Sequence, residues 1–354
     1  MTQARTYTVD LIAGDGIGQE VVPAATRVVD ALADRHGFRV AWRERQWGSA
    51  YFFEHGRMMP VDGIEILSDG DAILLGAVGH PELPDHETLW GLLIPIRREF
   101  LQYINLRPVR VLPGVVSPLR GVDDLDIVVV RENVEGEYSA VGGRVYRGAA
   151  EEFALQEAVF TRTGVTRVAR YAAELAASRS GSLTSATKSN GIIHSMPFWD
   201  EVVSSVVEDY DGVELKSVLV DALAAALVLR PHDFDVIVAS NLFGDILSDL
   251  IAALAGSIGI APSANINPPR DHPSMFEPIH GSAPDIAGKG IANPTGQLWS
   301  ASLMLDHLGE PAAAAGLMSA IDEVMAAGIR TADLGGSAGT EDFTAAVLRA
   351  VASS

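Results

Sequence analysis

The chain has 354 residues, with 46 acidic against 26 basic side chains, a formal net charge of −20 and no cysteine. The acidic balance argues against nucleic acid and anionic membranes as partners, because both attract cationic proteins. The lack of cysteine excludes disulfides, thiolate metal sites and a cysteine nucleophile, so a metal would need oxygen or imidazole ligands. Neither a signal-like N-terminus nor an apolar run of about 18 residues is present, so we expect a cytoplasmic protein of roughly two domains.

Strands and helices alternate along the chain, which predicts an α/β fold with a largely parallel sheet. The first strand, 7–13, ends at a glycine turn and leads into a helix that runs to Leu32. Later strands are expected at 72–75, 126–131, 182–187, 214–220 and 235–240, and helices at 165–177, 198–209, 244–254, 298–308, 312–326 and 341–351. The Pro- and Asn-rich tract Ala261–Pro273 predicts a loop, and Ser139–Ala149 predicts a hairpin or an extended arm.

The glycine turn Gly14–Gly18 has the place of a dinucleotide-binding fingerprint but not its spacing. Its third glycine follows the second by two residues, whereas the fingerprint requires three. We therefore favour a tight turn that feeds a helix, with glycine used for its conformational freedom.

Three aspartates are candidate ligands for a divalent cation. Asp245 and Asp249 are four residues apart in a predicted helix, so both carboxylates lie on one face. A hard cation such as Mg²⁺ or Mn²⁺ would relieve their repulsion. Asp221 interrupts the apolar run 218–229 and is a candidate third ligand. The alternatives are a solvated acidic face near a helix N-terminus and, for Asp221, a hydrogen-bonded structural carboxylate.

Basic residues gather in one part of this acidic chain. Four arginines, Arg97, Arg98, Arg107 and Arg110, fall within 14 residues, and Arg131 ends a later strand. Guanidinium groups bind carboxylates through two parallel hydrogen bonds, which indicates a site for a di- or tricarboxylate. Surface ion pairs with the many acids are the alternative.

Further candidates lie in three other segments. Lys188 after one predicted strand and Tyr138 after another have the chemistry of a base and a proton donor, although the sequence does not show that they meet. Small residues surround Asp285 in the segment 276–290. Such an acid could accept the ribose hydroxyls of a dinucleotide and repel a 2′-phosphate; the alternative is a structural loop.

Together these segments resemble the β-decarboxylating dehydrogenase family, which includes isopropylmalate, isocitrate and tartrate/D-malate dehydrogenases. The most specific motifs are Asn241–Asp249, Ser257–Asn267 and Phe276–Pro294, supported in the same order by 14–18, 97–108, 131–138 and 184–191. Within the family the chain is most similar to tartrate/D-malate dehydrogenases, on Pro84–His86, Leu89–Gly91 and Met196–Asp200. Pro95, His80 and Leu219 depart from that pattern and leave the exact substrate open.

The resemblance implies an isopropylmalate/isocitrate dehydrogenase-like fold of two α/β domains with a mixed, mostly parallel sheet, distinct from the standard Rossmann fold. Residues 1–105 and 260–354 would form an NAD-binding domain. Residues 106–259 would form a central substrate, metal and dimerisation domain with an arm near 138–160. The implied assembly is a homodimer whose active sites are shared between subunits.

The resemblance also implies a role for each matching residue. The metal would be bound by Asp245 and Asp249 of one subunit and Asp221 of the other. Lys188, from that other subunit, would assist removal of the C2 hydroxyl proton, and Tyr138 would protonate the enol carbon. Arg97, Arg107 and Arg131 would hold the substrate carboxylates, while Trp90 would fill the space of an isopropyl group. The implied NAD contacts are Asn190, Glu277, His280, Gly281, Ser282, Ala283, Asp285 and Asn293.

The implied function is NAD-dependent oxidative decarboxylation of a small 2-hydroxy dicarboxylate with Mg²⁺ or Mn²⁺: D-malate to pyruvate and CO₂, and the oxidation of tartrate. A requirement for K⁺ stays open. The alternatives are a 3-isopropylmalate dehydrogenase, favoured by Leu92, Leu93, Ile94 and the stretch 219–222, and a non-catalytic regulatory subunit. Retention of Lys188, Tyr138 and the three aspartates speaks against the second.

Overall fold

A computed structural model describes residues 5–353 of the chain. The chain forms two compact units, each assembled from separate stretches of sequence. The first unit contains the chain up to Gln102, Pro108–Asp124 and the chain from Ala252 onward; the second contains Tyr103–Arg107 and Leu125–Ile251. Because the chain passes between the units more than once, no linker separates them in the sequence.

The first unit is built on five strands in the order β2-β1-β3-β12-β11. They are β1 (Arg5–Gly14), β2 (Phe38–Glu44), β3 (Ala72–Ala77), β11 (Pro262–Ile266) and β12 (Ser274–Pro278). Pairing is parallel from β2 to β12, and β11 is antiparallel to β12. Every residue of β3 is buried, as expected of an interior parallel strand. This order differs from the Rossmann order.

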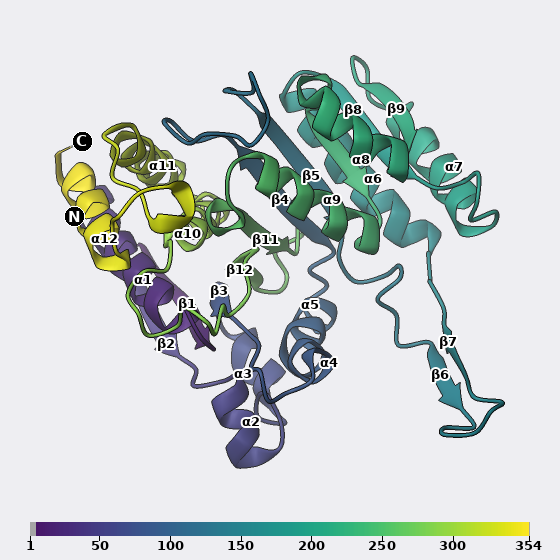
Figure 1. Ribbon diagram of the computed structural model, residues 1–354, viewed down its shortest axis with the longest axis horizontal. Coiled ribbons are helices and arrows are strands. Elements are labelled where there is room, and N and C mark those ends of the chain that lie inside the picture. Colours follow the sequence, from purple (N-terminus) through teal and green to yellow (C-terminus); the bar gives the residue numbers. More distant parts are fainter. Residues whose placement is uncertain (1–4, 354) are drawn as a thin grey trace. The chain divides into compact units, whose positions relative to one another are not determined.

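Helices pack on these strands and complete the first unit (Figure 1). They are α1 (Gly18–His36), α2 (Ser49–His55), α3 (Gly63–Ser68), α4 (Asp85–Thr88), a π-helical turn η1 (Leu89–Leu93), α5 (Ile94–Glu99), α10 (Thr295–His307), α11 (Pro311–Ala326) and α12 (Thr340–Ser353). Helix α1 ends at Gly37, which has a left-handed conformation with φ of 77° and closes the last turn.

The glycine turn after β1 lies against the segment that follows β12. Ile17 N donates to Ser282 O at 2.8 Å, and Asp15 N donates to Ala77 O at 2.7 Å. A Cβ at Gly16, whose φ is +54°, would stand 2.0 Å from Ser282 O. The turn therefore needs glycine to let two backbone segments meet, in agreement with the absence of a dinucleotide fingerprint.

The second unit contains the strand order β4-β5-β10-β8-β9, with parallel pairing from β5 to β9. The strands are β4 (Ile104–Arg110), which begins in this unit, β5 (Asp126–Glu132), β8 (Ser182–Thr187), β9 (Glu214–Leu219) and β10 (Val236–Ala239). The helices are α6 (Arg162–Ser178), α7 (Ser195–Val207), α8 (Val220–Leu229) and α9 (Asn241–Leu254). They lie alongside β8 and β9 in Figure 1.

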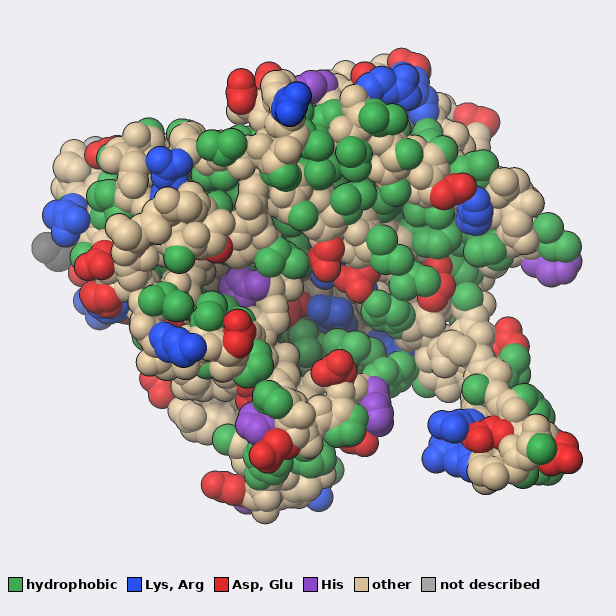
Figure 2. All heavy atoms as spheres, viewed as in Figure 1, with side chains coloured by type: hydrophobic (Ala, Val, Ile, Leu, Met, Phe, Trp, Pro, Cys, Tyr) green, Lys and Arg blue, Asp and Glu red, His purple; other side chains and the backbone are tan. Residues whose placement is uncertain are grey.

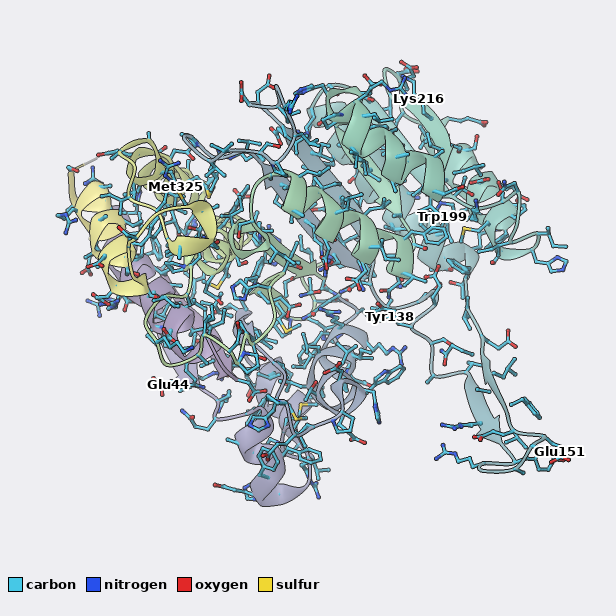
Figure 3. All side chains as sticks on the ribbon, in the orientation of Figure 1. Glu44, Tyr138, Glu151, Trp199, Lys216 and Met325 are labelled. Atoms are coloured by element: carbon cyan, nitrogen blue, oxygen red, sulfur yellow. The ribbon has the colours of Figure 1, made fainter. Side chains whose placement is uncertain are left out.

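An arm extends from the second unit. It is a two-stranded antiparallel hairpin of β6 (Gly142–Val145) and β7 (Phe153–Gln156), and every residue of both strands is exposed. In Figure 3, Tyr138 lies at the base of the arm and Glu151 at its tip. The hairpin confirms one of the two forms predicted for Ser139–Ala149, although its second strand lies beyond that range.

The α/β class predicted from the sequence is confirmed, with parallel and antiparallel pairing in one architecture. One local prediction is wrong: Ala261–Pro273 is not a continuous loop, because β11 occupies Pro262–Ile266. Proline is tolerated as the first residue of a strand, and the five residues of β11 are all buried. Among residues 5–353, no helix is both long and apolar enough to cross a membrane.

Candidate active site

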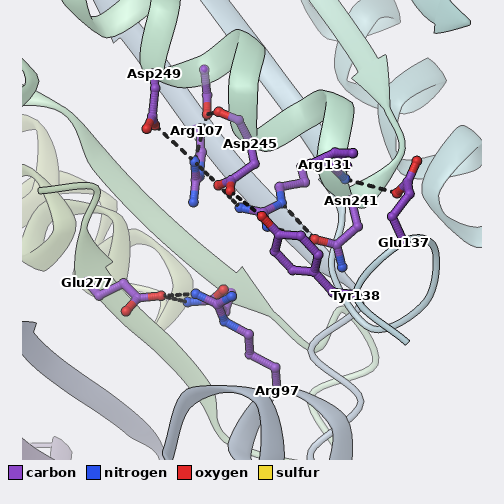
Figure 4. A network of polar contacts seen from close by, with 12 residues as sticks. Arg97, Arg107, Arg131, Glu137, Tyr138, Asn241, Asp245, Asp249 and Glu277 are labelled. Carbon is purple, nitrogen blue, oxygen red and sulfur yellow. Dashed lines mark hydrogen bonds and ion pairs between the residues drawn. The ribbon is translucent and has the colours of Figure 1, made fainter. Parts of the chain in front are cut away.

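Helix α9 presents two carboxylates to two buried arginines of the second unit (Figure 4). Arg107 Nη1 lies 3.1 Å from Asp245 Oδ1, 3.5 Å from Asp249 Oδ1 and 2.7 Å from Ser248 Oγ. Arg131 Nη1 also contacts Asp245 Oδ1. The arginine side chains are 7% and 1% exposed, whereas those of Asp245 and Asp249 are 32% and 50% exposed. The carboxylates therefore retain access to solvent above a buried layer of positive charge.

Tyr138 belongs to the same group. Its hydroxyl donates to Asp245 Oδ2 at 2.8 Å, and the Arg131 guanidinium lies 5.5 Å from the centre of its ring. Burial and the Asp245 carboxylate raise the pKa of the Tyr138 phenol above its usual value of 10.0, against the opposing influence of Arg131 and Arg107. The phenol thus holds its proton at neutral pH, as a proton donor must.

Lys188 and Asp221 form a second, separate group in this unit. Lys188 follows β8 and Asp221 lies in the first turn of α8, and Lys188 Nζ donates to Asp221 Oδ1 at 2.6 Å. The hydrogen bond from Lys188 lowers the pKa of Asp221 below 3.8. The side chains are 29% and 67% exposed. Asn190, two residues after Lys188, is exposed.

The candidate donors for a divalent cation are split between these groups. Asp245 and Asp249 offer carboxylate oxygens, which hard cations prefer, and their separation of one helical turn places them together. Burial and the neighbouring Asp245 raise the pKa of Asp249, while Arg107 opposes them. No cluster of three metal-binding side chains forms within residues 5–353, so the two carboxylates fit a cation only with a donor from elsewhere.

The first unit contains the remaining predicted arginine. Arg97 Nη2 donates to Glu277 Oε1 at 2.6 Å, and Asn265 Nδ2 donates to the same oxygen at 2.7 Å. Both ionic side chains are buried, at 9% and 8% exposed. Glu277, predicted to contact the cofactor, is thus partnered by an arginine predicted to contact the substrate.

Some buried arginine nitrogens remain unused. Among the described residues, the Nε atoms of Arg97 and Arg107 are buried without a hydrogen-bond partner. A buried donor left unpaired is costly and needs an explanation.

The other two arginines of the sequence cluster have different partners. Arg110 Nη2 contacts both oxygens of Asp322 at 2.8 Å, and its guanidinium lies over Trp299. Arg98 stacks 4.9 Å from the ring centre of Trp90, which is 37% exposed on the π-helical turn. Arg110 therefore forms an ion pair, which was the alternative to a role in carboxylate binding.

A pocket of about 260 Å³ opens in the first unit. Ile17, Ile258, Ala283, Ile286 and Ile291 supply apolar walls, and His280, Asn293 and Asp333 supply polar groups. Apolar walls with a few polar groups are typical of a cofactor pocket.

The polar groups of this pocket are arranged around a partly unsatisfied histidine. Burial lowers the pKa of His280 below 6.5, which favours the neutral form of its ring. His280 Nδ1 contacts Gly281 O at 3.0 Å, while Nε2 is buried without a partner among the described residues. Ser282 is buried with its carbonyl bonded to Ile17 N, Ala283 has φ of +41°, and Gly281 and Asp285 are exposed. Three of the predicted cofactor contacts, His280, Ala283 and Asn293, thus line this pocket.

Sequence reasoning missed two residues that organise these groups. Asp333 accepts hydrogen bonds from Ser257 Oγ at 2.6 Å and Asn293 Nδ2 at 2.9 Å; it lies in a Gly- and Ala-rich stretch that carries no distinguishing pattern. Asn241 begins the motif Asn241–Asp249 but received no role of its own. Its position four residues before Asp245 places both side chains on one helical face, but nothing in the sequence links Asn241 to Arg131.

Comparison with known proteins matches residues 8–347 to the family model described as isocitrate/isopropylmalate dehydrogenase. The chain is 55% identical to a "Probable tartrate dehydrogenase/decarboxylase" of Bacillus subtilis, over 96% of each chain. It is 52% identical to the "D-malate dehydrogenase [decarboxylating]" of Escherichia coli, over 98% of this chain and 99% of that protein.

A solved structure gives the same result for the fold. The crystal structure of isocitrate dehydrogenase from Methylococcus capsulatus matches with a TM-score of 0.89 and 34% identity, over 98% of this chain and 99% of that one. Sequence and fold agree over nearly the whole length, so the chain belongs to the isocitrate/isopropylmalate dehydrogenase family.

Proposed function

We propose that this protein is an NAD- and divalent-metal-dependent dehydrogenase that oxidatively decarboxylates D-malate to pyruvate and CO₂ and also oxidises tartrate. The relatives named for these two substrates support the choice. The single observation that carries it is a cluster that we call the α9 group, made of Arg107, Arg131, Tyr138, Asp245 and Asp249. In it, two buried guanidinium groups and a tyrosine hydroxyl converge on a half-exposed pair of aspartates. Such a group provides charge for a dicarboxylate, ligands for a cation and a proton donor.

The proposed roles follow the chemistry of the substrate. Arg97, Arg107 and Arg131 bind its carboxylates, and Lys188 accepts the proton of the C2 hydroxyl as hydride leaves C2. The C3–C4 bond then breaks, CO₂ departs, and Tyr138 delivers its proton to C3. Asp245, Asp249 and Asp221 would hold Mg²⁺ or Mn²⁺, whose positive charge would lower the pKa of the hydroxyl. NAD⁺ would supply the hydride acceptor; the pocket of the first unit would hold its adenosine, and Asp285 would accept hydrogen bonds from its ribose.

We further propose that the working form is a homodimer in which a second copy supplies Lys188 and Asp221 to the α9 group of the first. Hydrophobic side chains gather over α8 and α9 in Figure 2, where Val228, Leu229 and Ile246 are 41%, 77% and 56% exposed. The arm adds Phe153 and Leu155, each 53% exposed. An isolated hairpin is marginally stable in water, and an exposed apolar face favours a partner.

The substrate is tested by steady-state kinetics with D-malate, tartrate, 3-isopropylmalate and isocitrate in the presence of NAD⁺ and Mn²⁺. We expect kcat/KM to be highest for D-malate or tartrate. A kcat/KM for 3-isopropylmalate more than about tenfold higher, ~1.4 kcal/mol in barrier, would reject the proposal. Leu92 and Leu93, which favoured that alternative, pack into the hydrophobic core of the first unit, so they do not line an open pocket.

A further inference from the structure

Asn241 contacts Arg131 and also the backbone segment that leads into Tyr138. Its side chain is buried, at 3% exposed. Asn241 Oδ1 accepts hydrogen bonds from Arg131 Nε at 3.1 Å and Arg131 Nη2 at 2.7 Å. Asn241 Nδ2 donates to the backbone carbonyl of Glu135 at 3.0 Å. The amide thus joins a proposed substrate-binding arginine to the segment that leads into Tyr138.

The contacts with Arg131 fix the direction of its guanidinium. Asn241 and Asp245 lie one turn apart on the same face of α9. Arg131 spans this turn, with Nε and Nη2 on Asn241 and Nη1 on Asp245. Because the guanidinium is planar and rigid, holding two of its nitrogens also orients the third. A Cβ at Gly244 would lie 2.6 Å from Arg131 Cβ, so the helix approaches Arg131 as closely as glycine allows.

The contacts on the other side hold the segment before Tyr138. Glu137 Oε1 accepts from Ser240 Oγ at 2.8 Å, and Glu137 Oε2 accepts from Leu242 N at 3.0 Å. With the bond from Asn241 to Glu135 O, these form a clasp between residues 135–137 and the start of α9. Tyr138 then reaches Asp245 in the same helix (Figure 4). The clasp fixes the phenol from its backbone side as Asp245 fixes it from its hydroxyl side.

The bonding of Asn241 differs from that of an ordinary helix cap. A capping side chain uses its oxygen to accept a free N–H of the first turn. Here the oxygen faces Arg131, and the N–H of Leu242 is accepted by Glu137. The amide is therefore committed to neighbours of the site instead of to its own helix.

We propose that Asn241 is a positioning residue. It orients Arg131 to bind the substrate carboxylate, and it holds the segment before Tyr138 so that the phenol is placed for proton delivery. This rests on the roles given to those two residues in the proposed function. The two ends of the amide serve different partners, so they are separable. Asn241→Asp keeps the acceptor for Arg131 and removes the donor to Glu135 O, whereas Asn241→Ala removes both.

The experiment measures KM and kcat for D-malate, and the affinity for D-malate by calorimetry with Mn²⁺ and no NAD⁺. For Asn241→Ala we expect D-malate affinity to fall and KM to rise about tenfold or more, with kcat also about tenfold lower. For Asn241→Asp we expect affinity within about twofold of wild type and a lower kcat. This split between the two variants separates positioning from a general loss of structure.

Ser185→Ala is the matched control, because it removes a different buried hydrogen bond of the second unit, from Trp199 Nε1 at 2.9 Å. It should lower the melting temperature and leave KM and kcat unchanged. Asn241 variants that behave like this control would overturn the proposal, and Asn241→Asp supplies the answer alone if the alanine variant does not fold. A wild-type protein that neither binds nor oxidises D-malate would instead reject the proposed function, and this inference with it.

Discussion

The two polar groups of the second unit differ in how completely one chain builds them. In the α9 group, Arg131 and Arg107 are 1% and 7% exposed and converge with Tyr138 on one carboxylate. The Lys188–Asp221 pair has a single contact of 2.6 Å, with Asp221 67% exposed at the start of a helix whose apolar end is also exposed. The first group is preorganised by its own unit.

This difference teaches where the chain depends on a partner. A preorganised group orders its side chains during folding, so little further entropy is lost when a ligand binds. An exposed lysine–aspartate pair contributes little to the stability of the fold. Its side chains remain accessible to a partner. The contrast supports the proposal that the second group completes the site of another copy.

The largest expected effect comes from Asp245→Asn, which breaks the centre of the preorganised group. Asp245 is the common partner of Arg107, Arg131 and Tyr138. We expect kcat to fall by about 10³-fold or more, together with a weaker affinity for Mn²⁺ by calorimetry. An unchanged rate would contradict the assignment of the active site to this group.

Tyr138→Phe should have a smaller and more selective effect. It removes the proposed proton donor and leaves Asp245 and both arginines in place. We expect the overall formation of pyruvate from D-malate to slow by about 10²-fold, while D-malate affinity changes little. Equal loss of D-malate affinity would show that Tyr138 acts in binding rather than in proton transfer.

Local sequence patterns were sufficient for the class of the fold and for residue pairs within one element. Asp245 and Asp249 are on one helical face because four residues make about one turn. The spacing of the glycine turn correctly argued against a dinucleotide fingerprint. The strand β11 was missed because proline and asparagine suggest a loop, and only its burial beside β12 makes it a strand.

Local patterns do not predict contacts between residues that are far apart in the sequence. Nothing local links Tyr138 to Asp245, which are 107 residues apart, or Arg97 to Glu277, which are 180 apart. Lys188 and Tyr138 were candidates for one reaction, and the chain places them with different carboxylates. Tertiary packing decides such pairs, and the role of Asn241 emerged only from them.

The last expected effect is on the stability of the fold and not on the rate of the reaction. Burial raises the pKa of Glu132, beside Arg131, from 4.5 to about 7. A raised carboxyl pKa favours folding below pH 4.5, and that stability is lost as the pH rises to about 7, by about 3 kcal/mol. Glu132→Gln should flatten the free energy of unfolding over this range in urea titrations.

Asp221→Asn is the matched comparison from the exposed pair. The pKa of Asp221 is lowered below 3.8, so its contribution to the free energy of unfolding is lost only at more acidic pH. This variant should leave the change in the free energy of unfolding between pH 4.5 and 7 the same as in the wild type. A Glu132→Gln protein that keeps the wild-type pH dependence would contradict the assignment of this behaviour to the buried group.

The most direct test of the central claim, that one copy supplies Lys188 and Asp221 to the α9 group of another, mixes two inactive variants. Asp245→Asn and Lys188→Met chains are unfolded and refolded together in equal amounts, and each alone is the control. If sites are shared, half of the dimers are mixed and each contains one intact site, so activity returns to about a quarter of wild type. No recovery above the separate variants, with mixed dimers demonstrated by mass spectrometry, would contradict the account.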